Sequence, residues 1–313
     1  MNRSTRVLVG LLLFSLLSLG LALALGSGSP SDSALLRQIV LELRLPRALS
    51  AFAIGGLLAL AGVLMQVLLR NPLGDPYILG VSGGAATAAL LGMLLGAGGL
   101  MLSLGAFGGA MLAMFMVFAL SHGDGPASPT RLLLTGVVLA AGWGALISFL
   151  LAISPSPRLP GMLFWLMGDL SDADAPLLPA LALVAGGGVA WLLARPLNLL
   201  LQGADQAALL GVETDRLQWG VFLLASLLTA VAVTAGGSIG FVGLVVPHLY
   251  RLLDGSDHRR LIPGAILLGG GLLVVTDTLS RTLLAPRQLP VGVVTALVGV
   301  PLFLWLLRRQ APA

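Results

Sequence analysis

The sequence predicts an all-α polytopic membrane protein with about ten transmembrane helices and both termini on the cytoplasmic side. Three observations predict this class: 57% of the 313 residues are hydrophobic, only 10% are charged, and the mean hydropathy is +1.01. Soluble proteins carry about 25% charged residues, whereas a helix that crosses a bilayer needs roughly 20 consecutive apolar residues. A membrane β-barrel would instead show alternating segments of about ten residues.

Ten apolar segments are expected to form these helices. The first follows two arginines, and its apolar run is too long for a signal peptide, so we expect it to be retained. The runs 78–121 and 217–250 are each too long for one span and are expected to break at GAGG (96–99) and AGGSIG (235–240). The expected helices are 7–26, 46–69, two within 78–121, 132–153, 176–194, two within 217–250, 262–280 and 290–307.

The distribution of arginine predicts the orientation, because basic residues in short loops stay on the cytoplasmic side. All 17 basic residues are arginine, and with the N-terminus inside, 11 of them fall in inner loops and 6 in outer loops. Both termini are therefore expected inside. The net charge of +4 is explained by arginine at the membrane surface and does not indicate a nucleic-acid partner.

The expected spans are almost free of ionisable residues, which disfavours an ion-coupled secondary transporter. Asp277 is the one acid well inside an apolar run, and Arg281 follows one helical turn later, so a local ion pair is expected. A proton relay at Asp277 is the alternative. With no cysteine in the chain, thiolate chemistry and Cys-ligated metals are excluded.

An intramembrane enzyme is the other alternative. GVSGG (80–84) fits the G-x-S-x-G pattern of a serine nucleophile, which needs a base within reach. The three histidines are expected in inner loops (His122, His258) and in the eighth helix (His248). No P-loop is present. We therefore predict no catalytic residue, no metal ligand and no cofactor in this chain.

Six stretches, in this order and spacing, resemble one family. They are LRLPRALSAFAIGGLLALAGVLMQ (43–66), NPLGDPYILGVSGGA (71–85), FWLMG (164–168), GFVGLVVPHLYRLL (240–253), DHRRLIPG (257–264) and LPVGVVTALVGVPLFLWLL (289–307). Together they resemble the permease subunits of type II ABC importers for vitamin B12, iron–siderophores and haem, the FecCD and BtuC-like permeases. The resemblance covers nearly the whole chain.

The resemblance implies a single permease domain, 1–313, in the bacterial inner membrane. Such a subunit works as a homodimer with the pathway at the dimer interface. Two copies of a cytoplasmic ATPase use the ATP, and a periplasmic substrate-binding protein delivers the cargo. FWLMGDLSDAD (164–174) is slightly more similar to cobalamin permeases than to haem permeases, and haem and iron–siderophores stay open.

The resemblance also assigns the polar stretch QGADQAALLGV (202–212), within the inner loop 195–216, to two short helices that dock on the ATPase. Its small residues permit close approach, an acid in the first turn suits the helix dipole, and a late glycine suits a helix end. The expected coupling residues are Gly203, Ala204, Asp205, Gln206, Ala207, Ala208 and Gly211. An ordinary solvated loop is the alternative.

Two further groups of residues are candidates for function. Arg44, Arg47 and Arg281 match outer arginines of the family that pair with glutamates on the two lobes of the binding protein. Topology anchoring, or a partner within the chain such as Glu42 or Asp277, is the alternative. Most glycine pairs are expected to serve close helix packing. The pair 236–237 (Gly236, Gly237) interrupts a long apolar run and is therefore a candidate gate or hinge.

Overall fold

A computed structural model describes residues 2–26, 33–121 and 129–310, and within these ranges the chain is helical with no strand. His122 lies outside the described residues. The helices are α1 (Arg3–Ala24), α2 (Ser33–Ile39), η1 (Val40–Arg44), α3 (Leu45–Leu68), η2 (Pro76–Leu79), α4 (Val81–Leu95), α5 (Gly99–Ser121), α6 (Pro129–Ile153), α7 (Leu159–Met167), α8 (Leu177–Leu192), α9 (Ala194–Gln202), α10 (Ala204–Leu209), α11 (Thr214–Gly236), α12 (Val242–Asp254), α13 (His258–Thr282) and α14 (Val291–Gln310).

Each of the ten predicted segments contains one main helix, and both predicted breaks are confirmed. The first long run divides between α4 and α5, where Gly96 takes a left-handed conformation with φ +78°. The second divides between α11 and α12, across residues 237–241. Glycine ends a helix readily because it adopts positive φ without steric cost.

The helices differ in length more than the sequence predicted. Among the described residues, six helices are long and apolar enough to cross a membrane, and α8 with α9 makes a seventh if that pair, bent by 59°, is one span. The 13 residues of α12 rise only about 20 Å. This helix starts inside the bundle, after the non-helical segment 237–241. Such backbone is tolerated at membrane depth where protein covers it.

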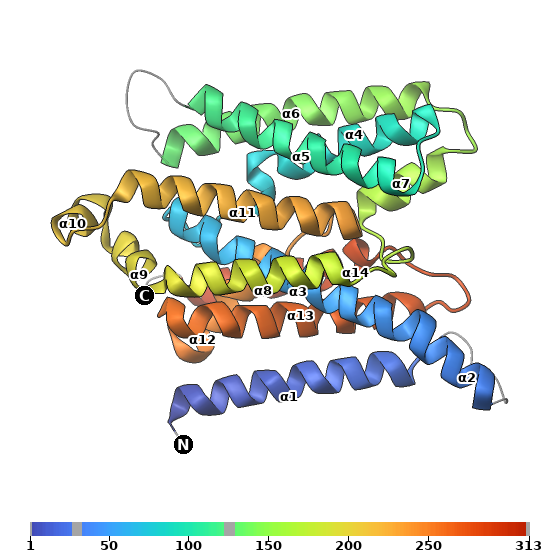
Figure 1. Cartoon of the computed structure of the whole chain (residues 1–313), viewed down its shortest axis with the longest axis horizontal. Helices are drawn as coiled ribbons and strands as arrows, with labels where there is room; N and C mark the ends of the chain where they lie inside the picture. The colour runs from blue at the N-terminus through green and yellow to red at the C-terminus, as the bar shows by residue number, and fades with distance from the viewer. Residues whose placement is uncertain (1, 27–32, 122–128, 311–313) are drawn as a thin grey trace.

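The second helix starts earlier than expected. The prediction began it at residue 46, but α2, the π turn η1 and α3 form one helix of 36 residues from Ser33 to Leu68. The part of this helix before α3 exposes its leucine side chains; Leu43, for example, is 65% exposed. Figure 1 shows α2 projecting from the end of the bundle opposite to α10.

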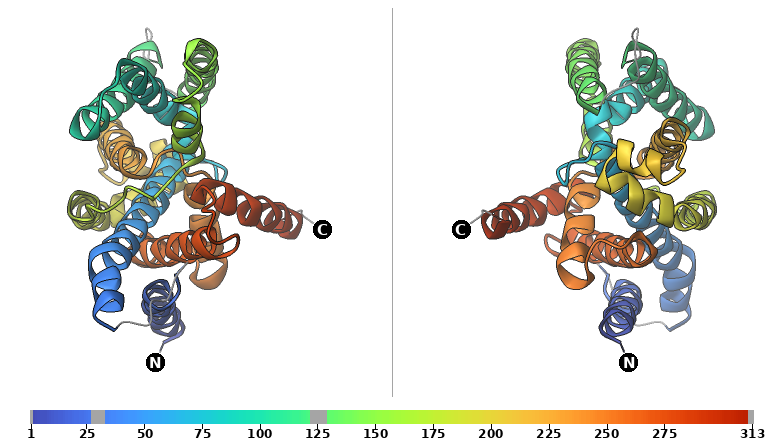
Figure 2. Two further views of the ribbon diagram at one scale, coloured as in Figure 1. Left: turned by 90° about the vertical axis from the view of Figure 1, so that its right-hand side faces the viewer. Right: turned by 90° about the vertical axis from the view of Figure 1, so that its left-hand side faces the viewer.

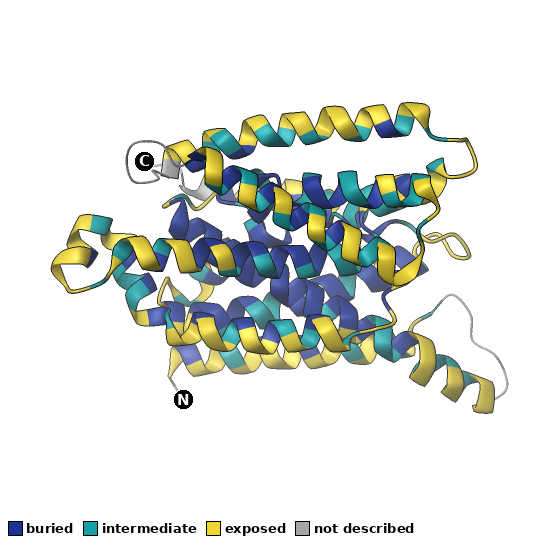
Figure 3. Cartoon of the chain, turned by 45° about the horizontal axis from the view of Figure 1, so that its top comes forward, coloured by how far each residue is buried: buried dark blue, intermediate teal, exposed yellow. Residues whose placement is uncertain are grey.

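Helix α3 forms the centre of the bundle, and its buried residues include every position from 53 to 68. It packs against α13, α11, α12 and α8, and Figure 3 shows the burial concentrated there. Glycine permits these contacts: a Cβ at Gly62 would overlap the backbone of Gly243, and one at Gly55 would overlap that of Gly269. The prediction that glycine pairs serve close packing is confirmed at Gly55 and Gly269.

Both termini lie at the same end of the bundle, together with α9 and α10 (Figure 1). We call this the inner end, and the opposite end, with α2 and the loop that follows α13, the outer end. This arrangement agrees with the orientation predicted from the arginine distribution, in which both termini and the loop 195–216 share one side.

Candidate functional site

The inner loop folds into two short helices, as expected. α9 and α10 are separated by Gly203, whose φ of +133° favours glycine. Asp205 lies in the first turn of α10. Gly211 stops the helix with φ +84°, and the Val212 N–H donates to the Ala207 carbonyl across 3.0 Å. The positions of Asp205 and Gly211 were expected from residue type, whereas the two-helix form was implied by the family resemblance.

Not all of the expected coupling residues are exposed, so only some of their side chains can touch a partner. Asp205, Gln206, Ala208 and Gly211 are exposed, and Gly203 and Ala204 are half-buried. Ala207 is only 1% exposed, so its methyl group packs inside the loop. A bulky charge at Ala207 would disrupt the loop itself and is therefore a poor probe of contact with an ATPase.

Two leucines that sequence reasoning missed dominate the surface of α10. Leu209 is 87% exposed and Leu210 is 64% exposed. In so hydrophobic a sequence, two more leucines do not indicate a contact surface. They become notable because α10 protrudes from the bundle (Figure 1). Adjacent exposed apolar side chains on a protruding segment make this loop a candidate protein contact.

Two of the three candidate docking arginines, Arg47 and Arg281, contact Asp277 at the outer end, and Arg44 binds the end of α1 instead. Arg47 Nη2 lies 2.7 Å from Asp277 Oδ1, and Arg281 Nε lies 3.1 Å from Oδ2. Arg44 Nη1 donates to the carbonyls of Leu23 and Ala24 at 2.8 and 3.2 Å. The expected Asp277–Arg281 ion pair is confirmed, and Arg47 from α3 joins it.

These arginines are engaged within the chain in this conformation. Arg44 is 6% exposed and Asp277 1% exposed, and the Arg47 side chain is 12% exposed. The internal partner of Arg47 is therefore Asp277 and not the nearby Glu42. Contact with glutamates of a binding protein stays a prediction. It would require Arg47 and Arg281 to leave Asp277, or to bind a glutamate and Asp277 at the same time.

The candidate hinge lies at a crossing that only glycine fits. Gly237 has φ +67° and ψ −161°, and a Cβ there would overlap the Trp165 carbonyl. The Asp169 N–H donates to the Gly236 carbonyl at 3.0 Å, which joins the end of α11 to the segment after α7. A hinge role for Gly236 and Gly237 stays a prediction.

Replacing Gly237 with alanine is expected to destabilise the protein by about 1–3 kcal/mol, because the change combines a strained φ with a backbone overlap. Thermal unfolding in detergent measures this. Gly220→Ala is the matched control: it lies in α11, the helix that ends just before Gly237, and has nothing within 4 Å of its would-be Cβ. This variant should unfold at or slightly above the wild-type temperature. Equal unfolding temperatures for both variants would contradict the assignment.

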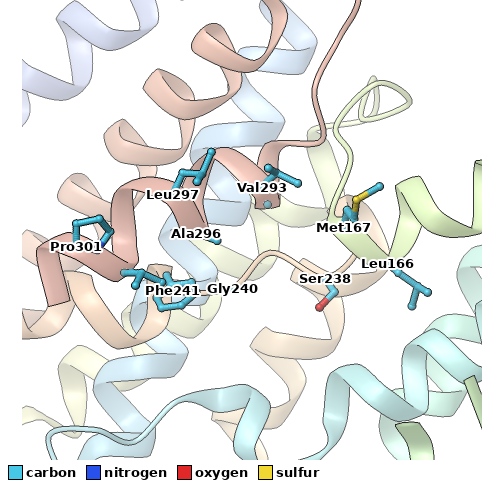
Figure 4. A pocket seen from close by; sticks show the side chains of 11 residues that line it. Leu166, Met167, Ser238, Gly240, Phe241, Val293, Ala296, Leu297 and Pro301 are labelled. Atoms are coloured by element: carbon cyan, nitrogen blue, oxygen red, sulfur yellow. The ribbon is translucent and has the colours of Figure 1, made fainter. Parts of the chain in front are cut away.

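An apolar cavity of about 580 Å³ opens between α7 and α14. Figure 4 shows Met167, Phe241, Leu297 and Pro301 along it, with Ser238 contributing its hydroxyl. Beside it, α14 contacts only α12, α13 and α7 among the closer helix pairs, and Figure 2 shows it leaning away from the bundle. Its exposed apolar residues include Leu297, Val298, Val300, Leu304 and Trp305.

The described residues offer no cluster of three or more His, Cys, Asp or Glu side chains that could hold a metal ion. The enzyme alternative gains no geometric support, because no described hydrogen bond joins Ser82 to a histidine. His258 hydrogen-bonds instead to Asn198 across 2.6 Å.

Comparison with known proteins gives a consistent result. The model of the FecCD transport family matches residues 7–309. The hemin transport permease HmuU of Yersinia pestis is 43% identical over 280 residues, covering 87% of this chain and 84% of that protein. The vitamin B12 import permease BtuC of Klebsiella pneumoniae is 38% identical over 325 residues, covering 99% and 95%.

A third relative and a solved structure extend this. The Fe(3+) dicitrate permease FecD of Escherichia coli is 40% identical over 278 residues, covering 87% of this chain and 86% of that protein. A metal-chelate type ABC transporter in an inward-facing conformation superposes with a TM-score of 0.90 at 32% identity, covering 98% of this chain and 100% of that one. The resemblance drawn from the six sequence stretches is confirmed.

Proposed function

This chain belongs to the FecCD transport family, and we propose on that basis that it is the membrane-spanning permease subunit of an ATP-driven importer. The proposed cargo is a bulky metal chelate, namely cobalamin, haem or an iron–siderophore, which moves from periplasm to cytoplasm across the inner membrane. A separate cytoplasmic ATPase hydrolyses the ATP, and a periplasmic binding protein delivers the cargo.

The observation that carries this proposal is the α9–α10 loop at the inner end. It protrudes from the bundle (Figure 1) and carries an exposed leucine pair, Leu209 and Leu210, on a short helix stopped by Gly211. A ligand or partner shifts a conformational equilibrium only through contacts that differ between the two states. A protrusion seated on an ATPase that opens and closes would supply such contacts.

The choice among the three cargoes rests on relatives that are almost equally similar. The hemin, vitamin B12 and ferric dicitrate permeases are 43%, 38% and 40% identical to this chain. The described cavity is apolar apart from Ser238, so it has few polar groups that could discriminate between chelates. We infer that the binding protein sets the selectivity.

We propose further that two copies of the chain pair across the face formed by α7 and α14. This face combines the apolar cavity with the exposed residues of α14, and it lies away from α8 in both views of Figure 2. Pairing there would enclose a cavity from each copy and place the cargo pathway between the subunits.

Cysteine cross-linking tests this dimer cleanly, because the native chain contains no cysteine. Leu297→Cys, at a position 69% exposed on α14, is expected to give a cross-linked dimer under oxidising conditions in membranes. Leu181→Cys, at a position 59% exposed on α8, is the matched control and should remain monomeric on a denaturing gel. Cross-linking through α8 but not α14 would place the dimer interface elsewhere.

The cargo and the class are tested together in a bacterial strain that lacks its own importers of this kind. The strain would express the chain with its ATPase and binding protein and be offered labelled cobalamin, haem and a ferric siderophore in turn. We expect accumulation of one of them. Accumulation of none, with all three proteins present in the correct compartment, would contradict the proposed cargo class.

A further inference from the structure

A single side chain, Asn198, joins the inner loop to the first turn of α13. Asn198 Nδ2 donates to Asp257 Oδ1 across 2.9 Å. Asn198 Oδ1 accepts from the His258 backbone N–H at 3.0 Å and lies 2.6 Å from His258 Nδ1. The side-chain amide of Asn198 therefore binds both Asp257, just before α13, and His258, the first residue of α13.

The contact completes the N-terminal cap of α13. Asp257 is the N-cap residue, and its carboxylate already accepts from the Arg259 N–H at 3.1 Å. The first four N–H groups of a helix have no partner within it, and Asn198 satisfies the one on His258. The hydrogen bond from Asn198 also lowers the pKa of the Asp257 carboxyl, so the acceptor is an ionised group and the bond is charge-assisted.

Any displacement of α10 reaches the bundle through few contacts. α10 packs against α9 and α11. α9 in turn is held by three buried apolar residues, Ala194, Leu197 and Leu200, and by the Asn198 amide. Apolar contacts of this kind are non-directional, whereas hydrogen bonds fix distance and angle. Asn198 thus sets the position of α9 along α13.

Helix α13 continues from this contact to the outer end without a break. Its 25 residues include His258 at the start and both Asp277 and Arg281 near the finish. From His258 to Asp277 the helix rises about 29 Å. A shift at the inner contact is therefore delivered to the ionic cluster at the outer end by one rigid element.

We propose that Asn198 is a positioning residue that couples the ATPase-facing loop to α13. The Asn198–Asp257–His258 contact transmits the movement of α9 to the helix that carries Asp277 and Arg281. This inference rests on the proposed function, since it assigns a route for the work of ATP hydrolysis. Asn198 lies on α9, so a change at this residue does not alter the side chains that α10 presents to the ATPase.

The test exploits a reciprocal exchange of the two side chains. Asn198→Asp alone sets a second carboxylate against Asp257 and is expected to lower the cargo imported per ATP hydrolysed by about fivefold or more, the low end of coupling between sites. Adding Asp257→Asn restores a matched donor and acceptor: position 198 accepts from His258 and from the new amide NH2. In the wild type Asp257 Oδ1 accepts from both Asn198 and the Arg259 N–H, so the new side chain must rotate for its oxygen to keep the cap on Arg259. The double variant should recover most of the wild-type ratio.

The ratio of uptake to ATP hydrolysis, measured in proteoliposomes with the ATPase and binding protein, separates positioning from stability. A contact that only stabilises the fold would lower the yield and unfolding temperature of Asn198→Asp but leave the ratio per assembled complex unchanged, and that result would overturn the proposal. A reduced ratio that the double variant fails to restore would also overturn it. Absence of ATP-dependent uptake by the wild-type complex would instead refute the proposed function itself.

Discussion

Replacing Leu209 and Leu210 together with aspartate is expected to abolish ATP-driven uptake and release the ATPase, while the membrane bundle stays folded. Both side chains are exposed, at 87% and 64%, so the change removes no packing from the isolated chain. In a complex they would be buried against the partner. A charge placed there loses its hydration and finds no counter-ion.

The expected effect is large because two apolar side chains would lose their burial at once. Burying one leucine side chain is worth about 1.5–3 kcal/mol, and each 1.4 kcal/mol is roughly a tenfold change in affinity. We therefore expect the affinity for the ATPase to fall by at least about 30-fold. Co-purification of the ATPase with the variant, followed by size-exclusion chromatography, measures this.

The outer end offers a matched control. Leu283 and Leu284 are also adjacent and exposed, at 59% and 57%, in the turn after α13. The same double change to aspartate there should leave the ATPase bound at wild-type strength. If both double variants bind the ATPase equally well, α10 is not the docking surface.

Replacing Asp277 with alanine is expected to cost about 3–5 kcal/mol of stability, because it leaves two largely buried guanidinium groups without their shared counter-ion. Domains have net stabilities of only about 5–15 kcal/mol, so much of the variant should fail to fold. Asp277 is 1% exposed and Arg281 7% exposed. Yield and thermal unfolding in detergent measure the loss, and Asp277→Glu, which keeps the charge, should lose much less.

A triple variant separates packing from docking. Arg47→Met, Asp277→Leu and Arg281→Met replace the whole cluster with apolar groups of similar size, which is often neutral for stability where a single deletion is not. The triple variant should regain most of the wild-type unfolding temperature. If the arginines also dock the binding protein, as the family resemblance implies, the triple variant should fold but bind that protein weakly. Wild-type binding would refute the docking role.

Arg47→Glu alone does not separate docking from stability. Reversing Arg47 to glutamate would place a second carboxylate beside Asp277, within the 2.7 Å contact that the arginine now makes. The variant would lose stability for that reason alone. Reduced docking by it would therefore not identify a contact with a binding protein.

The sequence predicts the helices well because their signals are local. Long apolar runs locate the helices, and the glycine-rich breaks at 96–99 and 235–240 fall where the structure has them. The two-helix form of the inner loop was implied by the family resemblance, and the ends of α10 follow from Asp205 and Gly211. The start of α2 was missed, since a helix that projects beyond the bundle needs no continuous apolar run.

Most contacts that define the site join residues far apart in the sequence, which a local pattern does not reveal. Arg281 was found as the partner of Asp277 because it lies four residues away, but Arg47 lies 230 residues away and on another helix. The role of Asn198 could not be predicted for the same reason, because its partners lie 59 and 60 residues further along the chain. The burial of Ala207 and the exposure of Leu209 depend on how α10 packs against α9, which residue type does not reveal.

The most direct test of the whole account is the energy source of transport. The chain would be reconstituted in proteoliposomes with its ATPase, and the binding protein loaded with the cargo found in cells would be added. The account predicts uptake that requires hydrolysable ATP and continues when ionophores collapse the proton and sodium gradients. Uptake that persists without ATP and stops with the ionophores would show an ion-coupled transporter and would contradict it.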